Sequence, residues 1–290
     1  MMKSTYNQGN LLKKETKMNV DEIIAKNSEM TKSERDFVRK LILEYKPKKI
    51  LEVGIAAGST SAIILDTIKT MDSHLYSVDL NTVHYKFKNK KSGFVVDSFP
   101  ELKSKWSLKT GKIVCNFLQE IGNDIDLCIL DTVHSNPGEF LDFLQVLPYL
   151  KKDAIVIIHD INYHVHFSHP HSFTCGNLFS VISGQKILPE TIEYEFFPNI
   201  GACKLSENSI NNIFDVFNCL TLPWAYVIPQ NQYQELINHF SKHYDQKLVD
   251  FFVHAFEYNN NLLKNKKQNK LSLSDCMDKF KKTFSCIKCV

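Results

Sequence analysis

Apolar residues along this chain form short continuous runs that alternate with stretches of helical periodicity. The runs predict buried strands over residues 50–53, 74–78, 106–110, 125–130 and 154–158. Helical spacing of apolar residues predicts helices over residues 30–45, 59–70, 113–121 and 137–150. Continuous apolar strands separated by helices indicate a parallel sheet whose two faces are both covered. We therefore expect an α/β fold with a doubly wound, mostly parallel sheet.

Two later segments complete the predicted sheet. Residues 192–197 and 201–205 are predicted to form an antiparallel pair across the turn Pro198-Asn199, which brings the sheet to seven strands. The predicted parts of the chain are an N-terminal arm (1–29), the main α/β domain (30–206), a helical C-terminal appendage (207–263) and a basic flexible tail (264–290).

The turn after the first predicted strand carries the most informative motif. It reads Glu52-x-Gly54-x-x-x-Gly58 and precedes a helix, an arrangement expected to surround a pocket with bare backbone N–H groups. Asp79 ends the second strand, where a carboxylate can accept hydrogen bonds from ribose hydroxyls. Alone, Asp79 would also suit a turn or a helix N-cap. Together the two features predict a nucleotide-like ligand.

Polar side chains stand at the ends of the later strands as well. Asp131 follows the fourth strand, His134 lies just beyond it, and His159 and Asp160 follow the fifth. Ligands of doubly wound sheets bind at the carboxyl ends of the strands, so these residues and the glycine turn predict one active site. Structural roles remain open, because His134 would also suit a helix cap and His159 a strand end bonded to backbone.

These motifs carry a resemblance to a known family. Residues 51–59, Leu-Glu-Val-Gly-Ile-Ala-Ala-Gly-Ser, resemble motif I of class I S-adenosylmethionine-dependent methyltransferases, and residues 76–79 are similar to the second motif, which holds the ribose. Residues 126–134 are similar to the fourth-strand motif of small-molecule O-methyltransferases. The Asp-x-x-His and later His-Asp patterns resemble a branch associated with sugars and polysaccharide biosynthesis. The resemblance spans about residues 32–205 and implies a Rossmann-like fold.

The resemblance implies S-adenosylmethionine as the cofactor and a role for each matching residue. The implied cofactor-binding residues are Glu52 before the turn, Gly54, Ala56 and Gly58 around the methionine part, Ser59 and Ser61 on its carboxylate, Asp79 on the ribose, and Gly111 and Lys112 near the adenine. Asp131 would lie beside both the sulfonium and the methyl acceptor.

Methyl transfer to an alcohol needs a base or a metal ion that activates the hydroxyl. His134 and His159 are the candidate bases, and Asp131 and Asp160 are candidate oxygen ligands for a divalent ion such as Mg²⁺. Related O-methyltransferases often use three Asp or Asn ligands, two of them adjacent after the fifth strand. Here His159 and Ile161 flank Asp160, and this departure favours a metal-free site with a histidine base.

The segments outside the motifs predict less. Residues 84–105 and 161–174 are irregular insertions, and the second holds four histidines: His164, His166, His169 and His171. They invite a zinc site, but no Cys or Glu stands at a recognised zinc spacing, so a polar acceptor-binding loop is expected. Cys286-x-x-Cys289 has no second cysteine pair and is interpreted as incidental thiols. The aromatic appendage is expected to pack on the main domain, with a lid or a homodimer interface as the alternative.

Composition narrows the function further. The 290 residues carry a net charge of +3, which gives no reason to expect nucleic-acid binding. No apolar run is long enough to span a bilayer and no signal-peptide pattern is present, so a cytoplasmic protein with reduced cysteines is expected. The leading hypothesis is an O-methyltransferase for a small sugar or sugar nucleotide. The alternatives are N-methylation of an amino sugar, an NAD-type oxidoreductase and a non-catalytic cofactor-binding scaffold.

Overall fold

A seven-stranded sheet forms the centre of the protein. The computed structural model describes residues 20–166, 173–190 and 197–268. The strands are β1 (Lys49–Val53), β2 (His74–Asp79), β3 (Trp106–Thr110), β4 (Ile125–Leu130), β5 (Leu150–His159), β6 (Gln185–Ile187) and β7 (Ile200–Lys204). They lie in the order β3-β2-β1-β4-β5-β7-β6, with β7 antiparallel to both neighbours and the other pairs parallel. The predicted doubly wound, mostly parallel seven-stranded sheet is confirmed.

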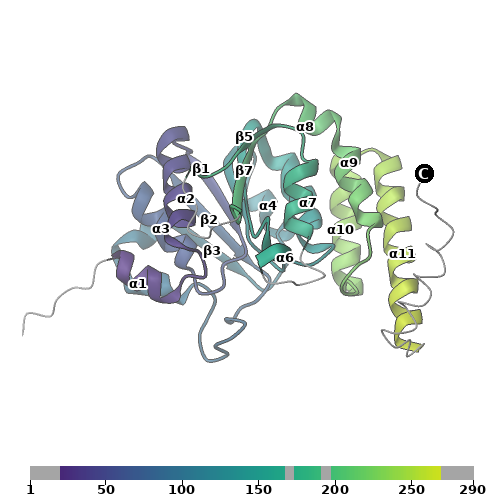
Figure 1. Cartoon of the computed structure of the whole chain (residues 1–290), viewed down its shortest axis with the longest axis horizontal. Helices are drawn as coiled ribbons and strands as arrows, with labels where there is room; N and C mark the ends of the chain where they lie inside the picture. Colours follow the sequence, from purple (N-terminus) through teal and green to yellow (C-terminus); the bar gives the residue numbers. More distant parts are fainter. Residues whose placement is uncertain (1–19, 167–172, 191–196, 269–290) are drawn as a thin grey trace, which may run out of the picture.

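Helices cover both faces of this sheet. They are α1 (Val20–Asn27), α2 (Lys32–Tyr45), α3 (Ser59–Ile68), α4 (Cys115–Ile121), α5 (Gly138–Val146), α6 (Tyr163–His166), α7 (Thr174–Val181), α8 (Glu207–Asn211), α9 (Ile213–Asn218), α10 (Gln230–His243) and α11 (Gln246–Gln268). Figure 1 shows α1–α3 on one side of the sheet and α7–α11 on the other. Alternate residues of β4 enter two separate cores, Leu127 and Ile129 beside α1–α3, and Cys128 and Leu130 beside α5. Burial on both faces explains the continuous apolar run of this strand.

The last strand pair differs from the prediction. The antiparallel partner of β7 on its outer side is β6, where Ile187 pairs with Ala202. The strand predicted over residues 192–197 falls, except for Phe197, outside the described residues. β6 has only three residues, Gln-Lys-Ile, and two of them are exposed, so it leaves no apolar run in the sequence.

The C-terminal helices form an outer layer against α5. The side chains of Phe217, Phe240 and Phe252 are fully buried and belong to the same core as β4 and α5. The hydroxyl of Tyr244 donates to the carbonyl of Leu144, 2.6 Å away. The aromatic residues of the appendage therefore serve mainly to attach it to the sheet. Among the described helices, none has the length and apolar character needed to cross a membrane.

The ends of the main domain and its first insertion are more ordered than the pattern suggested. Helix α1 lies inside the segment expected to be an arm, and its Ile24 is completely buried. Helix α11 continues past residue 263 to Gln268. The insertion contains two 3₁₀ helices, η1 (Phe94–Ser98) and η2 (Pro100–Lys105), whose apolar residues pack against α3. The insertion and the N-terminal segment thus both pack against α3.

Candidate active site

The glycine turn after β1 is held by Asp79 from the end of β2. One oxygen of this carboxylate accepts the backbone N–H groups of Ile55 and Ala56 at 3.0 and 3.1 Å. Its other oxygen accepts the N–H of Asn81 at 2.7 Å. The expectation of bare N–H groups in this turn is therefore wrong at these two positions, because a carboxylate of the chain itself already binds them. Asp79 fixes the shape of the turn and keeps lone pairs for a further donor.

The turn approaches β4 so closely that glycine is required at its start. Gly54 has φ +89°, and a Cβ atom there would lie 1.9 Å from the carbonyl oxygen of Asp131. This contact brings the glycine turn directly beside the polar residues that follow β4. Gly58 begins α3 with φ +87°, and a Cβ there would lie 2.7 Å from the Cα of Gly93 in the insertion.

Glu52 is a buried acid underneath the turn. Its side chain is fully buried and accepts the hydroxyl groups of Ser61 and Ser77, each at 2.6 Å. Burial raises the pKa of Glu52 to about 8, although the two serine hydrogen bonds act in the opposite direction. Glu52 and Ser61 thus bind each other, whereas the sequence resemblance implied that both serve the cofactor.

One cavity of about 1090 Å³ joins the glycine turn to the residues after β4 and β5. The predicted site residues in its wall are Gly54, Ala56, Asp79, Lys112, Asp131, His134, His159 and Asp160. The predicted residues that do not line it are Glu52, Gly58, Ser59, Ser61 and Gly111. Its wall also includes Glu29 from the N-terminal segment, Lys86 from the insertion, and Tyr226 and Gln232 from the appendage.

His159 is a buried cation among three carboxylates. Its Nδ1 lies 3.2 Å from Oδ1 of Asp131 and 3.4 Å from Oδ2 of Asp160, and its Nε2 lies 3.5 Å from Oε1 of Glu34. Burial alone would lower the pKa of His159, but Asp160 and Asp131 raise it well above the ordinary value. The imidazolium in turn lowers the pKa of Asp160 to about 2 against the effect of burial. An imidazole that stays protonated has no free lone pair with which to act as a base.

His134 is the more accessible of the two histidines. About a quarter of its side chain is exposed, and its Nε2 lies 3.1 Å from Oδ2 of Asp160 and 3.6 Å from Oδ1 of Asp131. His134 and Asp160 have φ of +50° and +59°, in the left-handed region that non-glycine residues seldom adopt. Such backbone strain is concentrated at functional sites, where the surrounding structure enforces it. Asp160 is also held by the side-chain amide of Asn199 at 2.6 Å.

Two acidic residues of α5 were missed by the sequence analysis. Glu139 is fully buried and accepts the backbone N–H of His134 as well as the hydroxyl of Thr132, 3.2 Å away. Asp142 accepts the same hydroxyl at 2.8 Å and lines the cavity. Burial raises the pKa of Asp142 to about 7, and the negative charge of the neighbouring Glu139 contributes to this rise. Their signal in the sequence is a pair of acids inside an apolar helix, three residues apart, so that both lie on one helix face.

Another missed residue, Glu34, comes from a segment far away in the sequence. Glu34 lies in the first turn of α2 and forms a capping box with Thr31, and its second oxygen faces His159. The capping pattern was visible in the sequence, but its contact with the active site was not. Of the histidine-rich segment, residues 167–172 lie outside the described part of the chain, as do Cys286 and Cys289.

Part of this chain is similar to known proteins. Residues 51–161 match a family described as a methyltransferase domain. The O-methyltransferase TomG from Streptomyces achromogenes, involved in tomaymycin synthesis and solved with SAM, has 14% identity and a TM-score of 0.48, over 64% of this chain and 90% of its own. An O-methyltransferase from Bacillus cereus, solved with SAH, has 13% identity and a TM-score of 0.48, over 67% of this chain and 93% of its own. No curated protein sequence is significantly similar to the chain.

Proposed function

Because residues 51–161 match a methyltransferase domain, we propose that the protein is an S-adenosylmethionine-dependent enzyme that transfers a methyl group to a hydroxyl of a small polar acceptor, most simply a sugar or sugar nucleotide. The observation that carries this proposal is the single cavity that joins the glycine turn and Asp79 to His134 and Asp160. A donor bound at the first end and an acceptor bound at the second would meet beside Asp131.

The first end of the cavity fits the methyl donor. Gly54 and Ala56 leave room at the turn, Asp79 offers acceptor oxygens for ribose hydroxyls, and Lys112 lies further along the wall. S-adenosylmethionine, when bound, supplies an electrophilic methyl group on a sulfonium centre. The chain's contribution is then mostly positioning, because an in-line displacement needs donor and acceptor to be held at the correct distance and angle.

His134 is the residue proposed to take the proton of the acceptor hydroxyl. His134 lines the cavity, and the carboxylates of Asp160 and Asp131, 3.1 and 3.6 Å from its Nε2, lie where they would stabilise the imidazolium that forms. His159 is proposed to act differently, as a fixed positive charge that holds Asp131 and Asp160 in place. The two histidines named together in the sequence analysis thus take separate roles.

A divalent cation fits poorly between Asp131 and Asp160. Those two carboxylates already share the imidazolium of His159, whose Nδ1 lies 3.2 and 3.4 Å from them. A metal ion would have to enter beside this buried positive charge, and both would compete for the same oxygens. We therefore derive no step through a metal ion at these residues.

The second end of the cavity supports a polyhydroxylated acceptor. Asp142 and Gln145 of α5 and Tyr226 and Gln232 of the appendage line it, which gives several donors and acceptors on an otherwise apolar wall. Since the pKa of Asp142 is about 7, its carboxyl group can donate as well as accept a hydrogen bond near neutral pH. Neighbouring hydroxyl groups of a sugar need this kind of mixed recognition.

Calorimetry with S-adenosylmethionine and S-adenosylhomocysteine tests the donor half of the proposal. We expect binding to the wild type and at least a tenfold weaker affinity for Asp79→Ala. The matched control is Asp72→Ala, because Asp72 is exposed at the opposite end of β2. Failure of the wild type to bind either compound, or binding of NAD in their place, would contradict the proposal.

Incubation with labelled methyl donor and a panel of acceptors tests the other half. The panel contains sugar nucleotides, amino-sugar nucleotides and phenols, and mass spectrometry of the products separates O-methylation from N-methylation. Transfer to sugar hydroxyls is expected. Transfer to phenols alone would overturn the sugar assignment but leave the methyltransferase assignment in place.

A further inference from the structure

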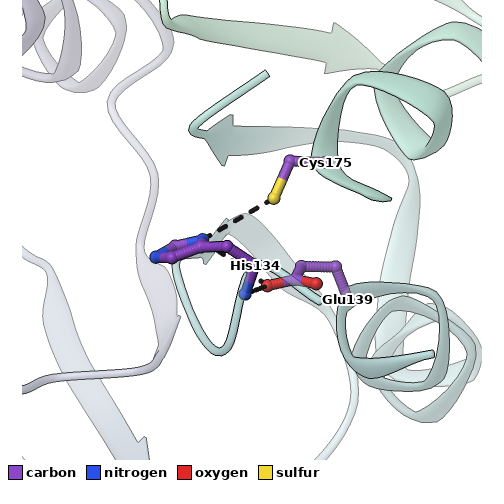
Figure 2. Close-up of side chains that lie close together, drawn as sticks. All are labelled: His134, Glu139 and Cys175. Atoms are coloured by element: carbon purple, nitrogen blue, oxygen red, sulfur yellow. Dashed lines mark hydrogen bonds and ion pairs between the residues drawn. The ribbon is translucent and has the colours of Figure 1, made fainter. Parts of the chain in front are cut away.

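A second group of ligand-type atoms lies on the far side of the His134 ring from Asp160. Nδ1 of His134 lies 3.7 Å from Sγ of Cys175 and 3.6 Å from Oε1 of Glu139. Figure 2 shows these side chains pointing toward one another from three places, the loop after β4, helix α5 and the start of α7. The chemistry proposed above uses neither Cys175 nor Glu139.

We propose that His134, Glu139 and Cys175 form a binding site for a zinc ion. In proteins zinc binds imidazole nitrogen, thiolate sulfur and carboxylate oxygen in a tetrahedron, at about 2.0–2.1, 2.3 and 2.0–2.2 Å. These bond lengths separate neighbouring ligand atoms by about 3.3–3.7 Å. The two separations around Nδ1 fall in or near that range, and all three ligand atoms lie within 4.8 Å of one another.

The buried carboxylate of Glu139 provides an independent reason for a cation here. Its side chain is fully buried, and its Oε2 has no hydrogen-bond partner among the described residues. A buried polar atom without a partner costs free energy, so native structures usually provide one, either a protein group, water or an ion. A zinc ion beside Oε1 or Oε2 would supply the missing interaction.

The opposite nitrogen of His134 has the partner that zinc sites commonly contain. A histidine that binds a metal usually donates its other N–H to a carboxylate, which orients the ring. Nε2 of His134 lies 3.1 Å from Asp160, and Asp160 is itself held by Asn199. The thiol and imidazole ligands favour zinc over Mg²⁺, which prefers oxygen ligands and an octahedral shell.

Zinc content of the full-length protein tests this site. The protein is produced with zinc, passed through a desalting column, and analysed by elemental mass spectrometry, with a chromophoric chelator to measure affinity. We expect equimolar zinc in the wild type and its loss in Cys175→Ser and in Glu139→Gln. The matched control is Cys128→Ser, because Cys128 is also buried but is not among the proposed zinc ligands. A Cys286→Ser/Cys289→Ser variant measures any zinc held by the tail thiols.

Cobalt substitution makes the test independent of how the variants fold. Tetrahedral Co²⁺ with one thiolate ligand gives a near-ultraviolet charge-transfer band, which we expect in the wild type and in the tail variant. No band in the wild type, or a band lost only in the tail variant, would overturn the proposal. So would zinc retained by both Cys175→Ser and Glu139→Gln. Zinc on Nδ1, with Nε2–H directed at Asp160, leaves His134 no lone pair for the acceptor proton, so methyl transfer is assayed after the zinc has been removed by a chelator. None of the zinc and cobalt readouts depends on methyl transfer, so the zinc site and the proposed function can fail separately.

Discussion

Nε2 of His134 lies 3.1 Å from Oδ2 of Asp160, and this contact joins the loop after β4 to the end of β5. Both residues adopt left-handed backbone conformations to make it. The proposed base and its supporting carboxylate therefore come from two neighbouring strands, and each is fixed by its backbone as well as by its side chain.

Replacement of His134 by Gln tests its role as the base. We expect the rate of methyl transfer to fall by about 10²–10⁴-fold, the range that general-base catalysis supplies. The affinity for S-adenosylmethionine should change little, since His134 lies at the acceptor end of the cavity. Single-turnover rates and calorimetry separate the two quantities. A variant with nearly wild-type turnover would exclude His134 as the base.

Replacement of Glu52 by Gln tests the buried acid under the glycine turn. The folded chain keeps Glu52 protonated up to about pH 8, whereas the unfolded chain releases this proton near pH 4.5. The free energy of unfolding of the wild type should therefore decrease as the pH rises between these values. Gln has no such titration, so between pH 4 and pH 7 the stability difference should shift in favour of the variant by on the order of 3 kcal/mol. Urea unfolding at several pH values measures it.

The exposed Glu101 serves as the control for that experiment. Glu101→Gln makes the same chemical change at an exposed position, and its pH dependence of stability is measured beside that of Glu52→Gln. If the stability difference between wild type and Glu52→Gln is the same at pH 4 and pH 8, then Glu52 is ionised in the folded protein and the assignment is wrong.

The cation assigned to His159 makes the opposite prediction. Its pKa is raised on folding, so its contribution to stability is complete below about pH 6.5 and is lost as the pH rises through the higher folded pKa. The stability difference between the wild type and His159→Gln should therefore be largest in mildly acidic solution and should shrink at alkaline pH. A difference that grows with pH would indicate a neutral imidazole among the three carboxylates.

Gln232 tests whether the appendage contributes to the acceptor site. It lies on α10 in the cavity wall, whereas Gln234, two residues later, is exposed and bonds Asn238. We expect Gln232→Ala to raise the KM for the acceptor several-fold without a change in S-adenosylmethionine affinity. Gln234→Ala should behave as the wild type. Equal KM values for the two variants would place the acceptor elsewhere in the cavity.

The sequence was sufficient for the central sheet but insufficient for its edge. Strands buried on both faces, such as β4, are continuous apolar runs that any hydrophobic pattern reveals. β6 is short and polar, and it is a strand only because the edge of β7 is available to it. A strand that forms only by pairing with its neighbour has little hydrophobic pattern in its own residues.

The candidate site was predictable at the ends of strands and not in its surroundings. Asp79, Asp131 and Asp160 could be identified because parallel strands bring their carboxyl ends together. Glu34 contacts His159 and Glu139 contacts His134. Both acids lie on helices, α2 and α5, whose packing against the site no local sequence pattern specifies. His159 differs from His134 because it is buried against Asp131 and Asp160, and this contact required the three-dimensional arrangement.

The cavity wall contains residues from both the beginning and the end of the described chain, from Glu29 to Leu236. During synthesis on the ribosome, the whole central sheet emerges before α10 can close the acceptor end. A chain that ends before α10 would lack Gln232 and Leu236 from this wall, and it would also lack the buried Phe240 and Phe252 of the core shared with β4 and α5. Acceptor binding and the stability of the fold therefore depend on the same two helices.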